Sequence, residues 1–393
     1  MPKRKLNNVT QRADGRWVAR KIFGYKPDGS PNRKIFYGNT AAEAAHKLTD
    51  YERQVENGLN TDAANLSFEQ WLPLWMREYK LKSLRPHTYD TYETLIKNRV
   101  NPILGKHKLL KLRPEHLQAF INNLKKENGE DPAVSTIKQI KCILSGALGQ
   151  AVKNGLITRN PADALSLPKG SSKRKVGAFT SSEQAALLDQ LKKHRLYALF
   201  VLALGTGMRI GEILALQWTE VDLSQNEITV SASVSRSKDR EISTGVAIKS
   251  SLKVDAPKTK AGHRSIPLTS EVRQILIEHR EAQIIERFRA GAVWVKNDLV
   301  FCTALGGYLE YRNVIRLYES NREQAGIPKL SFHSLRHSFA TNAIAAGLDY
   351  YYLSRIMGHT TISITLDTYT DFMPDKSRSE MEKMENILLL KPA

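Results

Sequence analysis

The sequence predicts a mainly α-helical protein with small β-sheets, divided into three domains. The chain has 393 residues, more than one hydrophobic core usually serves. Apolar residues recur at helical spacing beyond residue 66, whereas the first sixty residues alternate short strand-like runs with turn signals. Polar linkers separate these regions. The expected domains are residues 1–60, 66–165 and 175–393.

The first domain is expected to be a three-stranded sheet backed by a helix. Strand-like runs lie at Val9–Arg12, Arg16–Tyr25 and Lys34–Tyr37. A helix then begins after Thr40, a good N-cap residue, and runs to about Glu56. A sheet this small needs the helix behind it for stability.

The strands of this first domain are rich in basic residues, namely Arg12, Arg16, Arg20, Lys21, Arg33 and Lys34. An open sheet face with this charge could lie in the major groove of DNA. The alternative is a solvated charged face. The basic character of the rest of the chain favours DNA binding.

Residues 66–165 are expected to be all-helical. Aromatic side chains at Phe68, Trp71, Trp75 and Tyr79 have the spacing of a buried helical stripe. Further helices are expected to open at Pro86, Pro114 and Ser135. The basic residues on or beside these helices could contact DNA phosphates, namely Lys82, Arg85, Lys138 and Lys141.

The last domain is expected to be an α+β arrangement, with one β region among many helices. Its first helix follows the capping pattern Thr180–Glu183. The β region spans Ile228–Leu268.

The charge of the chain indicates a polyanionic partner. Lys and Arg number 59 against 40 Asp and Glu, a formal net charge of +19, and basic residues are in excess in each expected domain. No apolar run reaches the roughly 20 residues that a membrane span needs, so nucleic acid is a better partner than a membrane. Two distant cysteines exclude a disulfide framework and fit a reducing cytoplasm.

Four stretches of the last domain carry unusual residues. In the first, Gly205 and Gly207 interrupt an apolar helix, and Arg209 and Glu212 follow at a spacing that lets them pair. By itself such a pair is usually a structural salt bridge. The second stretch is a polar turn, expected at a hairpin tip, with Lys258 and Lys260 before an edge strand that ends at Ile266-Pro267.

The third stretch places His333, Arg336 and His337 on one face of a helix. Two histidines four residues apart can bind zinc, but no Glu follows the first and no third ligand is evident, so no metal is expected. In the fourth stretch a helix stops at Gly358, His359 lies in the turn, and a short helix carries Tyr369.

Together the four stretches resemble the tyrosine recombinase (phage integrase) family. The match is an ordered set: Thr-Gly-Met-Arg-x-Gly-Glu, a Lys before Ile-Pro-Leu, His-x-Leu-Arg-His, Met-Gly-His, and a Tyr ten residues after the last His. The family often has Leu-Gly-His where this chain has Met357-Gly358-His359. Residues 66–165 resemble the family's core-site-binding domain, and the first sixty resemble the small sheet domain with which many integrases hold arm-type sites.

The resemblance implies roles that suit the residues. A phosphodiester repels nucleophiles, and cations over its oxygens stabilise the transition state, so Arg209 and Arg336 would hold the phosphate. His333 and His359 would donate hydrogen bonds to it or assist proton transfer. Tyr369 would attack and hold a 3′-phosphotyrosine, which conserves the bond energy for rejoining.

The remaining roles concern the leaving group and the supporting residues. Lys258 would protonate the leaving 5′ oxygen, and its spacing before Ile266-Pro267 favours it over Lys260. Glu212 would fix Arg209, and His337 would support the site without being catalytic.

The resemblance therefore implies a site-specific recombinase of a bacterial mobile element, acting in the cytoplasm without cofactor or metal. Its expected partners are double-stranded DNA at core and arm sites, three further copies in a tetramer, and accessory proteins such as a DNA-bending host factor and an excisionase. The apolar tail at Ile387–Leu390 would dock on a neighbouring protomer or, equally, on its own domain.

Three other functions compete with this interpretation. A chromosome-dimer resolvase would resemble only the latter two thirds of the chain, and a type IB topoisomerase would not need an arm-binding domain. A non-catalytic DNA-binding regulator with the same fold would be expected to have lost at least one catalytic position, yet all are filled here.

Overall fold

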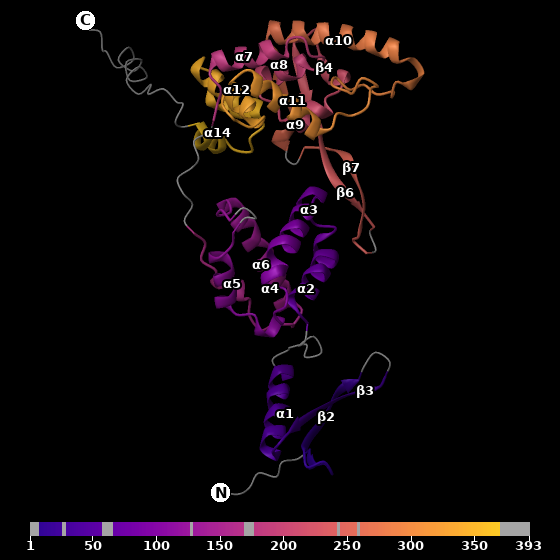
Figure 1. Ribbon diagram of the computed structural model, residues 1–393, viewed down its shortest axis with the longest axis vertical. Helices are drawn as coiled ribbons and strands as arrows, with labels where there is room; N and C mark the ends of the chain where they lie inside the picture. The colour runs from indigo at the N-terminus through magenta and orange to yellow at the C-terminus, as the bar shows by residue number, and fades with distance from the viewer. Residues whose placement is uncertain are drawn as a thin grey trace, which may run out of the picture. The chain divides into compact units, whose positions relative to one another are not determined.

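The computed structural model describes residues 8–25, 29–56, 66–125, 129–168, 177–241, 244–257 and 260–369 (Figure 1). The chain divides into two compact units. The first is Met1–Gly170 together with Lys238–Lys249, and the second is Ser171–Ser237 together with Ser250–Ala393. Helices dominate, and the sheets are small and antiparallel, as the sequence predicted. No helix within the described ranges has the length and apolar character to cross a membrane.

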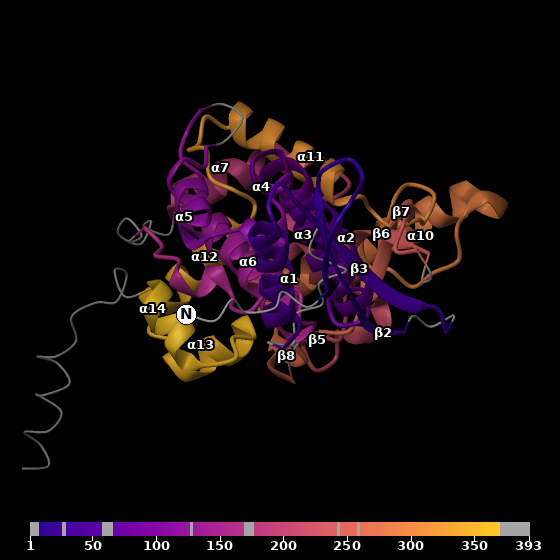
Figure 2. The same ribbon diagram turned by 90° about the horizontal axis from the view of Figure 1, so that it is seen from below.

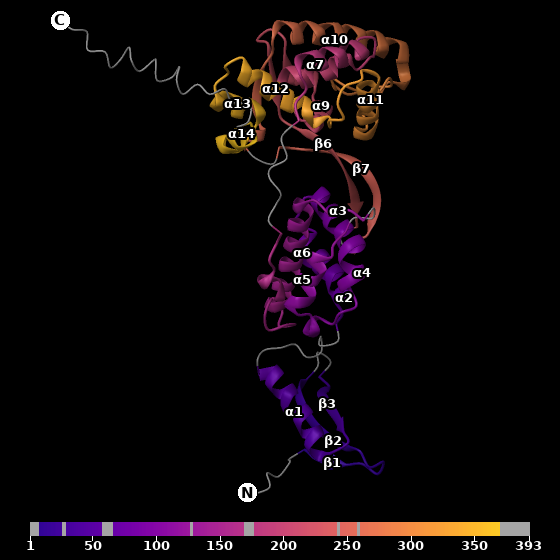
Figure 3. The same ribbon diagram turned by 60° about the vertical axis from the view of Figure 1, so that its left-hand side comes forward.

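The N-terminal module is the expected sheet and helix. Strands β1 (Val9–Gln11), β2 (Trp17–Tyr25) and β3 (Pro31–Gly38) form an antiparallel sheet in that order. Helix α1 (Ala41–Glu56) lies along one face of the sheet (Figure 3). The small core between them is made by Ala19, Ala44 and Leu48, with Trp17, Phe23 and Phe36 packed around it.

The basic side chains of this sheet divide between its two faces. In register, Arg20 lies opposite Ile35 and Lys21 lies opposite Lys34. Neighbouring residues of a strand point to opposite faces. The Lys21 Nζ donates to Glu52 of α1 at 2.8 Å, which places Lys21 and Lys34 on the helix side and Arg20 on the open face.

The same open face holds two further arginines. The guanidinium groups of Arg12 and Arg16 lie 6.0 and 5.6 Å from the centre of the Tyr37 ring. Tyr37 follows the core residue Phe36 on β3 and therefore points away from α1. The open face thus combines arginines with an exposed aromatic ring.

The helical module at 66–165 has the expected apolar core. Its helices are α2 (Phe68–Trp75), α3 (Pro86–Leu95), α4 (Asn101–Leu104), α5 (Pro114–Asn122) and α6 (Val134–Lys153), and π-helical turns at Met76–Lys80 and Ile96–Val100 extend α2 and α3. The predicted stripe is buried at Phe68, Trp71 and Trp75, while Tyr79 is exposed. The Trp71 indole donates to the Ala147 carbonyl of α6 at 2.9 Å, so the stripe packs on α6.

A β-hairpin segment belongs to this first unit although it comes from the later sequence. Strands β6 (Ser233–Arg240) and β7 (Ala247–Asp255) pair, and Lys238–Lys249 groups with the helical module. The Arg240 guanidinium donates to Asp90 and Glu93 of α3 and lies 4.5 Å from the centre of the Tyr89 ring. These contacts attach the hairpin tip to α3.

The second unit combines helices with a three-stranded sheet. Strands β4 (Val221–Asp222), β5 (Glu227–Val230) and β8 (Arg264–Pro267) form the sheet in that order. The β region predicted at Ile228–Leu268 contains β8 and all of β5 except Glu227, whereas β4 precedes it. The helices are α7 (Ser181–Leu191), α8 (Tyr197–Thr206), α9 (Ile210–Ala215), α10 (Ser270–Ala290), α11 (Tyr311–Gln324), α12 (His333–Ala345), α13 (Tyr350–Met357) and α14 (Ile362–Tyr369).

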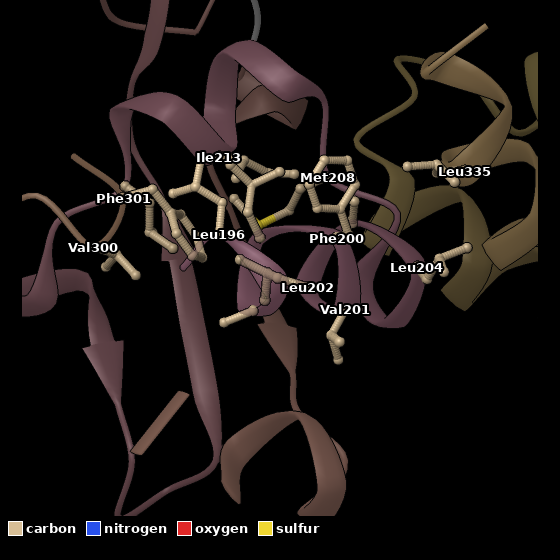
Figure 4. Packing of buried hydrophobic residues seen from close by; sticks show 14 of the residues in the cluster. Leu196, Phe200, Val201, Leu202, Leu204, Met208, Ile213, Val300, Phe301 and Leu335 are labelled. Atoms are coloured by element: carbon tan, nitrogen blue, oxygen red, sulfur yellow. The ribbon is translucent and has the colours of Figure 1, made fainter. Parts of the chain in front are cut away.

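Helix α8 is the centre of this unit. Nearly every side chain from Ala198 to Leu204 is buried, as expected of a helix that is apolar on all sides. Figure 4 shows Phe200 and Met208 packed in one cluster, with Leu335 of α12 approaching from the neighbouring helix. The turn that follows α8 is therefore held against α12.

A second apolar cluster joins α12, α13 and α14 through Ala340, Ile344, Leu353, Met357 and Tyr369, and Figure 2 shows α13 and α14 beside each other.

Gly207 allows the closest approach in this region. Its φ is +63°, and a Cβ there would lie 2.5 Å from Phe339 Cδ1 and 3.1 Å from Met357 Sδ. The residue thus needs both the left-handed backbone and the missing side chain. Its position fixes the turn that carries Arg209 against α12 and α13.

The substitution Gly207→Ala should destabilise the second unit through this clash. Gly326→Ala is the matched control, since Gly326 has φ +66° and open space around its Cβ position. Both variants place alanine in the left-handed backbone region, so this strain is common to both. The free energy of unfolding of Gly207→Ala should therefore be lower than that of Gly326→Ala by roughly 1–3 kcal/mol, the cost of overpacking. Urea denaturation measures the difference, and equal stabilities would contradict the packing described.

Candidate active site

Five of the six predicted catalytic residues lie in one part of the second unit. Arg209 follows α8, His333 and Arg336 are on α12, His359 follows α13, and Tyr369 ends α14. The sixth, Lys258, lies outside the described residues, as does the side chain of Lys260. The described strands before and after this segment belong to different sheets, because β7 pairs with β6 and β8 pairs with β5.

The Arg336 guanidinium is buried and held by backbone carbonyls. It donates to the carbonyl oxygen of Gly207 at 2.6 Å and to that of Met357. Burial lowers the pKa of Arg336 to about 9, and the nearby charge of Arg209 acts in the same direction. The group is therefore still charged at neutral pH, and it joins the turn after α8 to the end of α13.

Arg209 is oriented by Glu212 through a capping arrangement. Arg209 is the N-cap residue of α9, and both its backbone N–H and its guanidinium donate to the Glu212 carboxylate at 2.9 Å. The predicted pair is thus confirmed. The Glu212 side chain is buried, whereas that of Arg209 is 41% exposed and can reach a ligand.

A second arginine, Arg264, completes this network and was not singled out from the sequence. Its guanidinium donates twice to Glu212, at 2.8 and 3.1 Å, and also to the carbonyl oxygens of Ile356 and Gly262. The signal that could have found it is strand alternation. Arg264 lies two residues before the buried Ile266 on β8 and therefore shares its inward face.

The Glu212 carboxylate is charged in spite of its burial. Burial by itself would raise the pKa of Glu212, but hydrogen bonds from Arg264 and the charges of Arg264 and Arg209 outweigh it, and the net effect is a lowered pKa. One buried negative charge thus holds two guanidinium groups.

The histidines of the site are neutral at physiological pH. Burial, followed by the charges of Arg336 and Arg209, lowers the pKa of His359 to about 4. The same causes lower the pKa of His333. His359 Nδ1 lies 2.8 Å from the Thr365 hydroxyl of α14, and this contact orients the ring. Neutral imidazoles can donate a hydrogen bond through one nitrogen and accept through the other.

Tyr369 is almost completely buried, with 1% of its surface exposed. Burial raises its pKa to about 12, although the charge of Arg336 opposes the rise. Its hydroxyl lies 2.8 Å from Nδ1 of His337, whose pKa burial lowers to about 4. The residue that the sequence assigned only a supporting role is thus in direct contact with the predicted nucleophile.

The predicted DNA-contacting residues differ in their surroundings. Arg12, Arg16, Arg20, Lys82, Arg85 and Lys138 are exposed. Lys21 is paired with Glu52, and the Lys141 Nζ donates to the Leu165 carbonyl at 2.9 Å. Those two lysines therefore have structural partners in their own modules.

Across the described part of the chain, no three His, Cys, Asp or Glu side chains group in a way that could hold a metal ion.

Comparisons with known proteins identify the family of this chain. Residues 178–375 match the model of the phage integrase family, and residues 67–125 match its N-terminal SAM-like domain. A relative from Caldanaerobacter subterraneus, named as a tyrosine recombinase XerC-like protein, is 30% identical over 93% of this chain and 95% of its own length. The integrase of Streptomyces ambofaciens is 27% identical over 90% of this chain and 89% of its own.

Solved structures show the same fold. The integrase of transposon Tn1549, in complex with transposon right end DNA, has a TM-score of 0.64 and 24% identity over 81% of this chain and 99% of its own. A lambda integrase dimer bound to a core site has a TM-score of 0.57 and 17% identity over 96% of this chain and 97% of its own.

The fold and the site define an enzyme that breaks and rejoins DNA. The chain belongs to the phage integrase family of tyrosine recombinases, and its function is site-specific recombination.

Replacing Glu212 by Gln should impair DNA cleavage more than DNA binding. The amide keeps the shape but leaves two arginines without their shared negative charge, so Arg209 loses its orientation. The cleavage rate should fall about 10–100-fold, as when other partners of reactive groups are removed. Glu286→Gln, which weakens a separate pair with Arg195, is the control and should leave cleavage unchanged. Equal rates for the two variants would contradict the role of Glu212.

Proposed function

We propose that this chain is the integrase of a mobile element and that Tyr369 cleaves DNA by forming a 3′-phosphotyrosine. The proposal is carried by one group of side chains: the guanidiniums of Arg209 and Arg336, neutral histidines and a buried tyrosine. They come from α12, α14 and the turns that follow α8 and α13. Relatives named as the ICEBs1 integrase of Bacillus subtilis and the transposase of transposon Tn916 support a mobile element as the source.

In this mechanism the scissile phosphate binds between Arg209 and Arg336. The partly exposed Arg209 meets the phosphate oxygens, and Arg336 supplies a second positive charge from the protein interior. Guanidiniums held before the phosphate arrives need little reorganisation as charge develops in the transition state. His333 and His359 donate hydrogen bonds to the same oxygens.

The leaving group and the rejoining step complete the cycle. Lys258 protonates the 5′ oxygen as the bond between phosphorus and that oxygen breaks. The phosphotyrosine retains the energy of the broken bond, so a 5′ hydroxyl can attack it later and restore the DNA without ATP. No cofactor or metal enters any step.

Covalent trapping on nicked suicide DNA tests the nucleophile. Wild type incubated with the core site in EDTA should give a protein–DNA band on a denaturing gel, and Tyr369→Phe should give none because the attacking oxygen is missing. Tyr352→Phe is the control, since Tyr352 on α13 is 60% exposed and should leave the band intact. If wild type binds the site yet forms no band, the non-catalytic regulator becomes the better interpretation.

In this proposal the domains bind different sites on the DNA. The sheet module at 1–60 holds arm-type sites, while residues 66–165 and 175–393 hold the core site. A lambda integrase tetramer bound to a Holliday junction supports strand exchange by four protomers. A DNA-bending host protein and an excisionase would set the direction.

Substitutions of two adjacent residues that point to opposite faces of β2 test whether the sheet module binds arm-type sites. Arg20→Ala should weaken binding to DNA flanking the core site about three- to tenfold and lower the salt dependence by about one counterion, because Arg20 is on the open face. Lys21→Ala should bind as wild type, because Lys21 is paired with Glu52. Electrophoretic mobility shifts at several salt concentrations measure both, and equal losses would exclude a face-specific contact.

A further inference from the structure

The hydroxyl of Tyr369 has a specific partner that the family motif alone does not assign. His337 Nδ1 lies 2.8 Å from this hydroxyl, and the two rings meet edge to face at 5.7 Å between centroids. His337 lies on α12 one residue after Arg336, so the same turn of helix presents a cation and an imidazole to the site. The apolar cluster of α12, α13 and α14 holds the tyrosine ring in this position.

The low pKa of His337 leaves its imidazole neutral and able to accept a proton. The low pKa of His337 follows from burial and then from the charges of His333 and Arg336 on the same helix. His359, which follows α13, lies close enough to interact with it electrostatically. A neutral imidazole carries its proton on one of its two nitrogens, and in the Nε2–H tautomer the phenol of Tyr369 donates and Nδ1 of His337 accepts. In that tautomer the tyrosine proton already points at His337.

We propose that His337 is a catalytic residue of this enzyme, the base that takes the proton of Tyr369 when the tyrosine attacks DNA. The inference rests on the proposed role of Tyr369 as nucleophile. His333, the first histidine of the motif, is farther from Tyr369 than His337 is. Its ring contacts the His337 ring edge to face at 4.8 Å between centroids.

The proposed step balances in atoms and charge. The O–H bond of Tyr369 breaks as the bond from its oxygen to phosphorus forms, and the proton passes to Nδ1 of His337. The bond from phosphorus to the 5′ oxygen breaks, and that oxygen receives its proton from the general acid, proposed to be Lys258. During rejoining the attacking 5′ hydroxyl gives its proton to the neutral Lys258 as its oxygen bonds to phosphorus. The bond from phosphorus to the tyrosine oxygen breaks, the imidazolium of His337 returns its proton to that oxygen, and both groups are restored.

DNA binding prepares His337 for this transfer. The phosphate brings negative charge beside Arg336, one of the groups that keep the imidazole neutral. The bound phosphate offsets part of that positive field and favours the imidazolium. Transfer takes place as phosphorus bonds to the phenol oxygen, so a free phenolate need not form.

The substitution His337→Asn separates proton transfer from positioning. The Asn amide oxygen can accept the hydrogen bond near the position of Nδ1 but cannot take up the proton. Single-turnover cleavage of suicide DNA should slow about 100-fold at pH 7, the lower end of general base effects. DNA affinity should be unchanged. His337→Gln serves as a second variant and should lose cleavage to a similar degree.

The pH dependence provides the readout that a structural role would not change. Wild type should cleave at nearly constant rate from pH 6 to 9, where His337 is neutral. Without the base, cleavage needs the ionised tyrosine, whose pKa is about 12, so the rate of His337→Asn should rise about tenfold per pH unit. A loss of equal size at every pH, or no loss, would overturn the proposal.

A modified substrate distinguishes the base from the acid. DNA with sulfur in place of the bridging 5′ oxygen has a leaving group that needs no proton. This substrate should restore cleavage by Lys258→Ala but not by His337→Asn, and rescue of His337→Asn would overturn the assignment. If wild type itself forms no covalent band, the proposed function fails. If wild type and His337→Asn cleave alike, only the role of His337 fails.

Discussion

The buried carboxylate of Glu212 is the interaction on which the active site depends. It lies between Arg209 and Arg264, and Arg264 also holds the carbonyl oxygens of Gly262 and Ile356. The turn after α8, the segment before β8 and the end of α13 are thereby joined through one charge. Breaking a buried pair by removing one partner typically costs about 3–5 kcal/mol, so this group fixes the geometry strongly.

The charges around that carboxylate influence the protonation states of the remaining site residues. Three guanidiniums lie near a single negative group, and the surplus positive charge is what a phosphate would complement. The same field, together with burial, keeps His333, His337 and His359 neutral. This combination suits the proposed binding of phosphate by the cations and the proposed proton transfer from Tyr369 to His337.

Much of this arrangement could be predicted from the sequence because local chemistry specifies it. Glycines mark the turn before Arg209, helical spacing places His333 beside Arg336, and a capping pattern opens α7 at Thr180. Tertiary contacts could not be predicted in this way. The pairing of Arg264 with Glu212, the pairing of β8 with β5 and the contact between His337 and Tyr369 join segments far apart in sequence, and no local pattern encodes such contacts.

The central claim is that one tyrosine, Tyr369, forms the covalent link to DNA from within this cationic site. Its most direct test is to trap the covalent complex of the wild-type protein, digest it with protease and identify the nucleotide-bearing peptide by mass spectrometry. The account predicts that the modified peptide contains Tyr369 and that the phosphate is on its phenol oxygen. A phosphate on any other residue, such as one of the tyrosines at 350–352, would contradict it.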